Sequence, residues 1–200
     1  MFAGHFGIAQ LGKGARRDLP LLMLVAAAFL PDILRFLISG FTSRFDLLSH
    51  SIPVVAALSF GIGLLWLLRS GNVAAAGVLA LVCLLHWPAD VFTGCKPTTF
   101  DGPWIGLMSY RRPVSDLVVE GTLVVAGWYY MRRRGIAIGR IWLVVPFVVQ
   151  LAFLVSMYWD AEFFIGQREW MWKPSESWVP QRHVLETLSC RPPDVASSFH

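Results

Sequence analysis

The sequence predicts an all-α protein, a polytopic membrane helix bundle of about five hydrophobic helices preceded by a short amino-terminal half-helix. Two observations predict this fold class. First, the 200 residues are 56% hydrophobic, their mean hydropathy is +0.57 and only 15% are charged, against roughly 25% in a typical soluble domain. Second, the apolar residues occur in long blocks rather than in the narrow stripes of soluble helices.

The apolar blocks divide the chain into a transmembrane domain over residues 1–166 and a polar, extramembrane tail over residues 167–200. Residues 1–11 are too short to cross a bilayer, so they either lie at the interface or enter the bundle as a half-helix carrying His5. Pro31 is expected to kink the first span, because its ring removes a backbone donor. The predicted spans cover about 19–41, 51–68, 73–92, 113–131 and 141–164.

Basic residues cluster at the ends of the blocks, which indicates a membrane orientation rather than nucleic-acid binding, despite the net charge of +4. With a cytoplasmic amino terminus, the cytoplasmic turns hold Lys13, Arg16, Arg17, Arg69, Arg132, Arg133, Arg134 and Arg140. The opposite loops hold Arg44, Lys96, Arg111 and Arg112. The bias predicts a multi-pass protein of the inner (plasma) membrane with a cytoplasmic amino terminus, in contact with lipids and with no nucleic-acid partner.

Several ionisable side chains lie within or beside the apolar blocks, where an unpaired charge is costly. His86 and Asp90 are four residues apart, so they share one helix face and can bind one cation. Asp46 and His50 repeat this spacing at the mouth of the preceding span. Together with Asp32 they fall in the same, outer half of the bilayer. Such a mixed nitrogen and oxygen set suits a divalent metal (zinc, manganese or iron), whose expected chemistry is acidification of a bound water.

Each of these residues also has a local explanation. Asp32 and Arg35 are three residues apart and can neutralise each other. His50 can be an interfacial residue or a helix cap, and His86 can bond to a backbone carbonyl inside the bundle. Their common depth favours a polar site, while metal binding and its absence both stay open.

The fourth span carries two further acidic residues on one helix face. Asp116 lies near the membrane edge and is expected to form a surface ion pair with Arg111 or Arg112. Glu120 is deeper and is expected to face the bundle, as a substrate contact or a partner of a histidine. The two arginines are either a topology signal or a contact for a lipid phosphate.

Four short motifs occur in order over residues 1–95: Gly4-His5-Phe6-Gly7, Leu30-Pro31-Asp32, Ser49-His50-Ser51 and His86-x-x-x-Asp90. This arrangement resembles the small bacterial membrane proteins called membrane-bound metal-dependent hydrolases. Further along, Gly106-Leu107 and Val119-Glu120-Gly121 are similar to an uncharacterised branch of such proteins. The family often has a histidine and an arginine before its Thr-His-Ser, where this chain has Phe45 and Asp46. The resemblance implies a metal-ligand set of His5, Asp32, His50, His86 and Asp90.

The lead hypothesis is a metal-dependent hydrolase of a lipid or lipid-linked substrate, with zinc or manganese as the cofactor. In this scheme Asp46 or Glu120 acts as the base, and Arg111 and Arg112 meet the headgroup. The alternative is a non-enzymatic membrane protein (a small transporter, ion carrier or scaffold) that uses the same residues for ion passage or packing. A fixed cation discriminates the two hypotheses. A haem bound by paired histidines is a third option.

Overall fold

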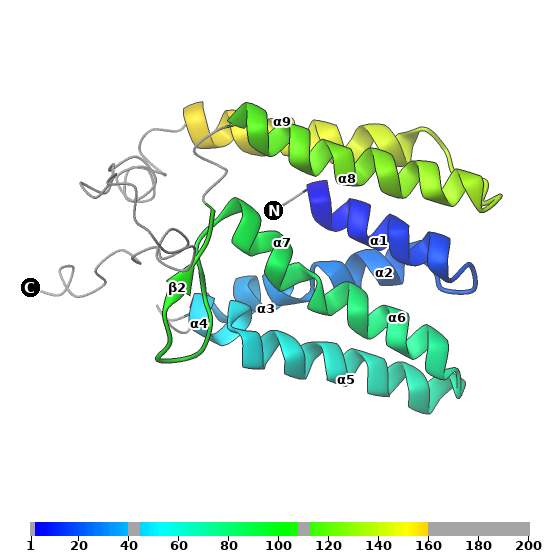
Figure 1. Ribbon diagram of the computed structural model, residues 1–200, viewed down its shortest axis with the longest axis horizontal. Coiled ribbons are helices and arrows are strands. Elements are labelled where there is room, and N and C mark those ends of the chain that lie inside the picture. Colours follow the sequence, from blue (N-terminus) through cyan, green and yellow to red (C-terminus); the bar gives the residue numbers. More distant parts are fainter. Residues whose placement is uncertain (1–2, 40–44, 108–112, 160–200) are drawn as a thin grey trace, which may run out of the picture.

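The computed structural model describes residues 3–39, 45–107 and 113–159. These residues are mostly helical, so the all-α prediction is confirmed (Figure 1). The helices are α1 (Ala3–Ala15), α2 (Leu21–Ala28), α3 (Leu30–Ile38), α4 (Phe45–His50), α5 (Ile52–Ser70), α6 (Val73–Leu84), α7 (His86–Thr93), α8 (Pro113–Arg133) and α9 (Ile141–Trp159). A small antiparallel hairpin joins β1 (Lys96–Pro97) to β2 (Trp104–Ile105).

Among the described helices, fewer than the five predicted are long and apolar enough to cross a membrane. α5 is long and apolar enough to cross, and so are α6 and α7 taken as one unit, Val73–Thr93. α2 and α3 meet the requirement only as one span bent by 54°. α8 carries acidic residues in its first half and arginines at its end, and the apolar part of α9, Ile141–Ala152, is shorter. Two or three segments of the described chain are therefore long and apolar enough to cross a membrane, and five crossings stay a prediction.

The predicted kink in the first span is present and directs a carbonyl group toward the site. α2 ends at Ala28, and α3 begins at Leu30 with Pro31 in its first turn. Proline has no backbone N–H and its ring crowds the preceding turn, so it favours a new helix start here. The carbonyl oxygen of Ala28, at the bend, accepts a hydrogen bond from His86 on α7.

α1 lies inside the bundle, packed against α8 and α2 and also in contact with α6 and α9 (Figure 1). Most of its residues are buried: Ala3, Gly4, His5, Gly7, Ile8, Ala9, Gln10, Gly12 and Gly14. Of the two alternatives for the amino-terminal segment, the interfacial one is therefore wrong. The segment enters the bundle and carries His5 with it.

α1 and α8 approach closely because glycines lie in their contact. A Cβ atom on Gly7 would lie 2.5 Å from the backbone carbon of Leu123, and one on Gly127 would lie 2.6 Å from the carbonyl oxygen of Gly7. Small residues permit such backbone contact, a common device in membrane helix pairs. The contact fixes the height of α1 against α8 and hence the position of His5, two residues before Gly7.

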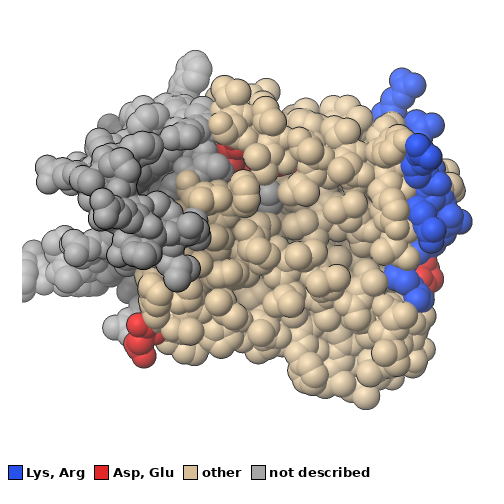
Figure 2. Space-filling model, in the orientation of Figure 1, with Lys and Arg blue, Asp and Glu red and all other residues tan. Residues whose placement is uncertain are grey.

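Basic side chains gather at one end of the bundle. Figure 2 shows lysine and arginine at the end where α1 joins α2, α5 joins α6 and α8 joins α9. At this end Arg16 donates two hydrogen bonds to the carboxylate of Asp18, which lowers the pKa of that carboxyl. The hairpin, α4 and the start of α1 lie toward the opposite end (Figure 1).

Replacing Gly7 by leucine is expected to push α1 away from α8, because a clash with backbone atoms cannot be relieved by rotating a side chain. Overpacking of this kind costs about 1–3 kcal/mol, which should lower the thermal unfolding midpoint of the purified protein in detergent. Gly77→Leu on α6 is the matched control, since nothing lies within 4 Å of a Cβ atom there. Equal midpoints for the two variants would contradict this role of Gly7.

Candidate metal centre

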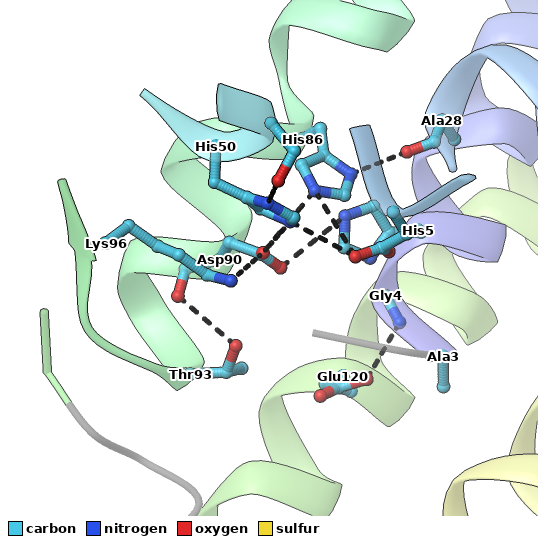
Figure 3. Close-up of polar contacts among 12 residues, drawn as sticks. Ala3, Gly4, His5, Ala28, His50, His86, Asp90, Thr93, Lys96 and Glu120 are labelled. Atoms are coloured by element: carbon cyan, nitrogen blue, oxygen red, sulfur yellow. Dashed lines mark hydrogen bonds and ion pairs between the residues drawn. The ribbon is translucent and has the colours of Figure 1, made fainter. Parts of the chain in front are cut away.

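Four side chains converge from three separate segments of the chain, and Figure 3 labels His50, His86 and Asp90 among them. Asp32 comes from α3, His50 from the last residue of α4, and His86 and Asp90 from α7. One ligand atom from each lies within 4.8 Å of the ligand atoms of the other three. The structure therefore brings together four of the five side chains predicted as metal ligands.

The carboxylates and imidazoles have the spacing of a mononuclear metal centre. Oδ2 of Asp90 lies 3.3 Å from Nε2 of His50 and 3.4 Å from Nε2 of His86. Oδ1 of Asp32 lies 3.1 Å from the same atom of His50 and 4.0 Å from that of His86. Ligands placed about 2.1 Å from a tetrahedral ion lie about 3.4 Å from one another. The donor set thus fits a single divalent ion.

His86 is held by a hydrogen bond on the side that faces away from the carboxylates. Its Nδ1 lies 2.7 Å from the carbonyl oxygen of Ala28, so this nitrogen donates. Nε2 is then the lone-pair nitrogen, and it has no hydrogen-bond partner among the described residues although it is buried. Metal-binding histidines usually donate their second ring N–H to such a carbonyl. The predicted carbonyl bond is therefore present and is compatible with ligation.

His50 is held in a comparable way, and Asp32 is the accessible member of the cluster. The hydroxyl of Ser49 lies 2.6 Å from Nδ1 of His50, which leaves Nε2 toward the two carboxylates. His50 and His86 are completely buried and Asp90 is 3% exposed, whereas the side chain of Asp32 is 33% exposed. Asp32 is therefore the member of this four-residue cluster that is exposed at the surface.

His5 reaches the cluster from α1 and lies beside the four-residue set. Its Nε2 is 3.7 Å from Oδ1 of Asp90, the oxygen that faces away from His50 and His86. The rings of His5 and His86 pack with their centroids 4.1 Å apart. His5 is fully buried, and in the described part of the chain neither of its ring nitrogens has a hydrogen-bond partner.

Lys96 is a site residue that the sequence analysis counted only as an orientation signal. It lies on β1, and its Nζ is 3.0 Å from Oδ2 of Asp90 (Figure 3). The hairpin is tied to the helices around it, because the N–H of Ile52 donates to Thr98 and the N–H of Leu107 donates to Val91. The only sequence signal for Lys96 is its place six residues after Asp90, beyond the end of α7.

Glu120 faces the bundle as predicted, but its described contacts are with α1 and α9. Its Oε2 accepts a hydrogen bond from the N–H of Gly4 at 3.0 Å, and its Oε1 accepts one from Nε2 of Gln150 at 3.2 Å. The N–H of Ala3 donates to Oε1 of Gln150. The first N–H groups of a helix have no partner inside the helix, and a carboxylate there also interacts favourably with the helix dipole. Glu120 therefore anchors the helix that carries His5.

Four other residues of the predicted site have different outcomes. Asp116 is completely buried and accepts a hydrogen bond from Gln150 at 2.8 Å, so its expected place at the surface is wrong. The reason is that α9 covers this face of α8. The side chain of Asp46, on α4, and both Arg111 and Arg112 lie outside the described residues. Their roles as base and headgroup contacts stay predictions.

Comparison with known proteins found no matching family model, no matching curated protein and no matching solved structure. The resemblance to membrane-bound metal-dependent hydrolases therefore stays a prediction from short motifs. The function has to be argued from the geometry of the site.

Replacing Glu120 by leucine is expected to loosen the start of α1. The buried N–H of Gly4 would lose its acceptor, which costs about 1–3 kcal/mol. Glu120→Gln keeps an amide oxygen for this N–H and should be milder. Hydrogen exchange of the α1 amides, followed by mass spectrometry, measures the effect. Exchange as slow in Glu120→Leu as in the wild type would show that Glu120 does not anchor α1.

Proposed function

We propose that this protein is a multi-pass membrane protein with a divalent metal centre held by Asp32, His50, His86 and Asp90. The observation that carries the proposal is the convergence of four donor atoms within 4.8 Å of one another. Buried carboxylates in apolar surroundings are costly unless a cation balances them. Two imidazoles and two carboxylates suit zinc or manganese.

The burial pattern of α8 and α9 supports counting these two helices as membrane crossings, although length and hydropathy alone do not identify them. Asp116 and Glu120 are completely buried, so the charged groups in the first half of α8 face the bundle. Most exposed positions are apolar, for example Val118 on α8 and Val148 and Leu151 on α9, and Ser115 and Thr122 are exposed polar residues on α8. Polar groups inside and apolar groups outside are typical of helices that face lipid.

The basic end of the bundle is the proposed cytoplasmic end. Lysine and arginine gather there (Figure 2), and the positive-inside rule places such turns in the cytoplasm. The metal centre then lies toward the outer face. α1 begins at Ala3 beside this centre, and only its last turn, at Lys13, reaches the basic end. A cytoplasmic amino terminus therefore does not follow from this orientation.

The activity that fits this centre best is hydrolysis of a lipid or lipid-linked substrate. A divalent ion bound by these residues would supply Lewis-acid chemistry and acidify water. The chain supplies the rest of the site. His86 and His50 are oriented by Ala28 and Ser49, and the burial of their rings excludes bulk water. His5, whose ring nitrogens have no hydrogen-bond partner in the described structure, is placed to accept a proton beside Asp90.

A carrier requires a water-accessible path through its ionisable groups. The imidazoles of His5, His50 and His86 are completely buried, and Asp90 is almost so. Among the described residues of the cluster, only Asp32 is substantially accessible. This distribution favours a fixed site with one entrance over an ion pathway.

Metal analysis of the purified protein tests the centre directly. The wild type is expected to retain about one zinc or manganese ion per chain, and His86→Ala and Asp32→Asn are expected to lose most of it. Asp18→Asn, at an exposed carboxylate of the basic end, is the control and should keep the metal. A correctly folded wild type without metal would refute the centre and leave the carrier or scaffold alternative.

Cysteine labelling of intact cells tests the orientation. Asp101→Cys, in the exposed turn of the hairpin, should react with a membrane-impermeant maleimide in intact cells. Ser70→Cys, exposed at the α5–α6 turn, should react only after lysis. The unmodified chain gives the background from the native cysteines. The reverse pattern would place the basic end outside.

A further inference from the structure

Lys96 brings a positive charge into the candidate metal centre. Its Nζ contacts Oδ2 of Asp90, the oxygen that also faces His50 and His86. An ammonium group has three N–H donors, and one carboxylate oxygen uses one of them. Lys96 is therefore equipped to bind a second anionic group next to the position of the metal.

The charges of the centre favour an anionic ligand. Among the described residues, the carboxylates of Asp32 and Asp90 would balance a divalent ion, and the ammonium of Lys96 then adds one positive charge beside the imidazoles. The carboxylates of Glu120 and Asp116 are engaged by the start of α1 and by α9. An unbalanced charge in apolar surroundings is costly. A phosphate group would balance it and accept hydrogen bonds from the ammonium.

An apolar groove of about 690 Å³ runs along α5. Its volume lies within the roughly 300–1,000 Å³ of ligand pockets. Pro53 and Leu65, which both line it, are twelve residues apart on α5, or about 18 Å along a helix. This is slightly more than half of the roughly 30 Å hydrocarbon core of a bilayer. The groove thus has the length of one lipid leaflet.

The groove and the metal centre are built from the same elements. α3 carries Asp32 into the centre and Leu30 into the wall of the groove. The hairpin carries Lys96 into the centre, and the connection between its strands carries Phe100 into the wall. One end of the groove, at Leu30 and Pro53, therefore lies within three residues of Asp32 and His50 along the chain.

We propose that the protein binds a phosphate-bearing membrane lipid, with one apolar chain in the groove along α5 and the phosphate at Lys96 beside the metal centre. The proposal rests on the metal centre proposed above and names the substrate class for it. A lipid satisfies both halves of the site at once, because its chain matches the groove and its phosphate matches the charge.

Photo-crosslinking of the full-length protein in phosphatidylcholine nanodiscs tests the groove. The probe is phosphatidic acid with a diazirine in one acyl chain, and mass spectrometry locates the labelled peptides. Labels are expected on residues 53–65 of α5. Gly61→Phe should lower this labelling about tenfold by filling the groove, since nothing lies within 4 Å of a Cβ atom there. Gly77→Phe makes the same change at an equally open position on α6 and should leave the labelling unchanged.

A second arm tests the headgroup. Lys96→Gln is expected to weaken binding of the phosphatidic acid probe about tenfold, with no change for a diacylglycerol that carries the same diazirine chain. Arg69→Gln, at the basic end, is the control and should bind both probes as the wild type does. Millimolar inorganic phosphate should not displace the lipid probe. Displacement by inorganic phosphate would overturn the lipid as the source of the phosphate.

Equal labelling of Gly61→Phe and Gly77→Phe, or wild-type affinity in Lys96→Gln, would overturn the proposal. These results are independent of the metal analysis. Metal in the wild type without labelling of the groove refutes the lipid site alone. Labelling of the groove without bound metal refutes the metal centre, and with it the placement of the lipid phosphate beside that centre.

Discussion

The carboxylate of Asp90 organises the site end of the bundle, because buried imidazoles from α1, α4 and α7 and the ammonium of Lys96 all face its two oxygens. An ionisable group isolated in apolar surroundings costs several kcal/mol. Asp90 and the imidazoles are therefore stable here only in contact with one another. The helices that carry them have to meet at one depth. The bend before Pro31, the glycine contact between α1 and α8, and the ties of the hairpin to α5 and α7 are the means by which they do so.

α1 shows what this constraint requires of a short helix. Without water around it, a helix inside a bundle needs protein partners for its terminal backbone groups. Its first N–H groups have such partners in Glu120 and Gln150. At its other end Nζ of Lys13 donates to backbone carbonyls of the turn that follows, and Nε2 of Gln10 donates to a carbonyl on α9. His5 is therefore placed by a helix that is fixed at both ends, which suits a side chain that acts at a defined distance from Asp90.

The parts of the site that could be predicted are those with local signals. The spacing of His86 and Asp90 places both on one helix face whatever surrounds them, and a proline inside an apolar block predicts a bend. Lys96 could not be predicted, because its position depends on a hairpin that folds back over α7 and has no periodic pattern. The burial of Asp116 and the contacts of Glu120 depend on how α1 and α9 pack against α8, which a single helix does not encode. The number of membrane spans is uncertain from sequence for the same reason. A charged group that faces the inside of a bundle and one that faces water look alike in a sequence.

X-ray absorption at the metal edge of the purified, zinc-loaded wild type tests most directly the claim that side chains from separate helices share one ion. The account predicts nitrogen and oxygen ligands at about 2.0–2.2 Å, with the multiple scattering of two imidazoles and no sulfur. A shell that contains sulfur at about 2.3 Å, or one of oxygen atoms without imidazole scattering, would place the metal elsewhere and contradict the account.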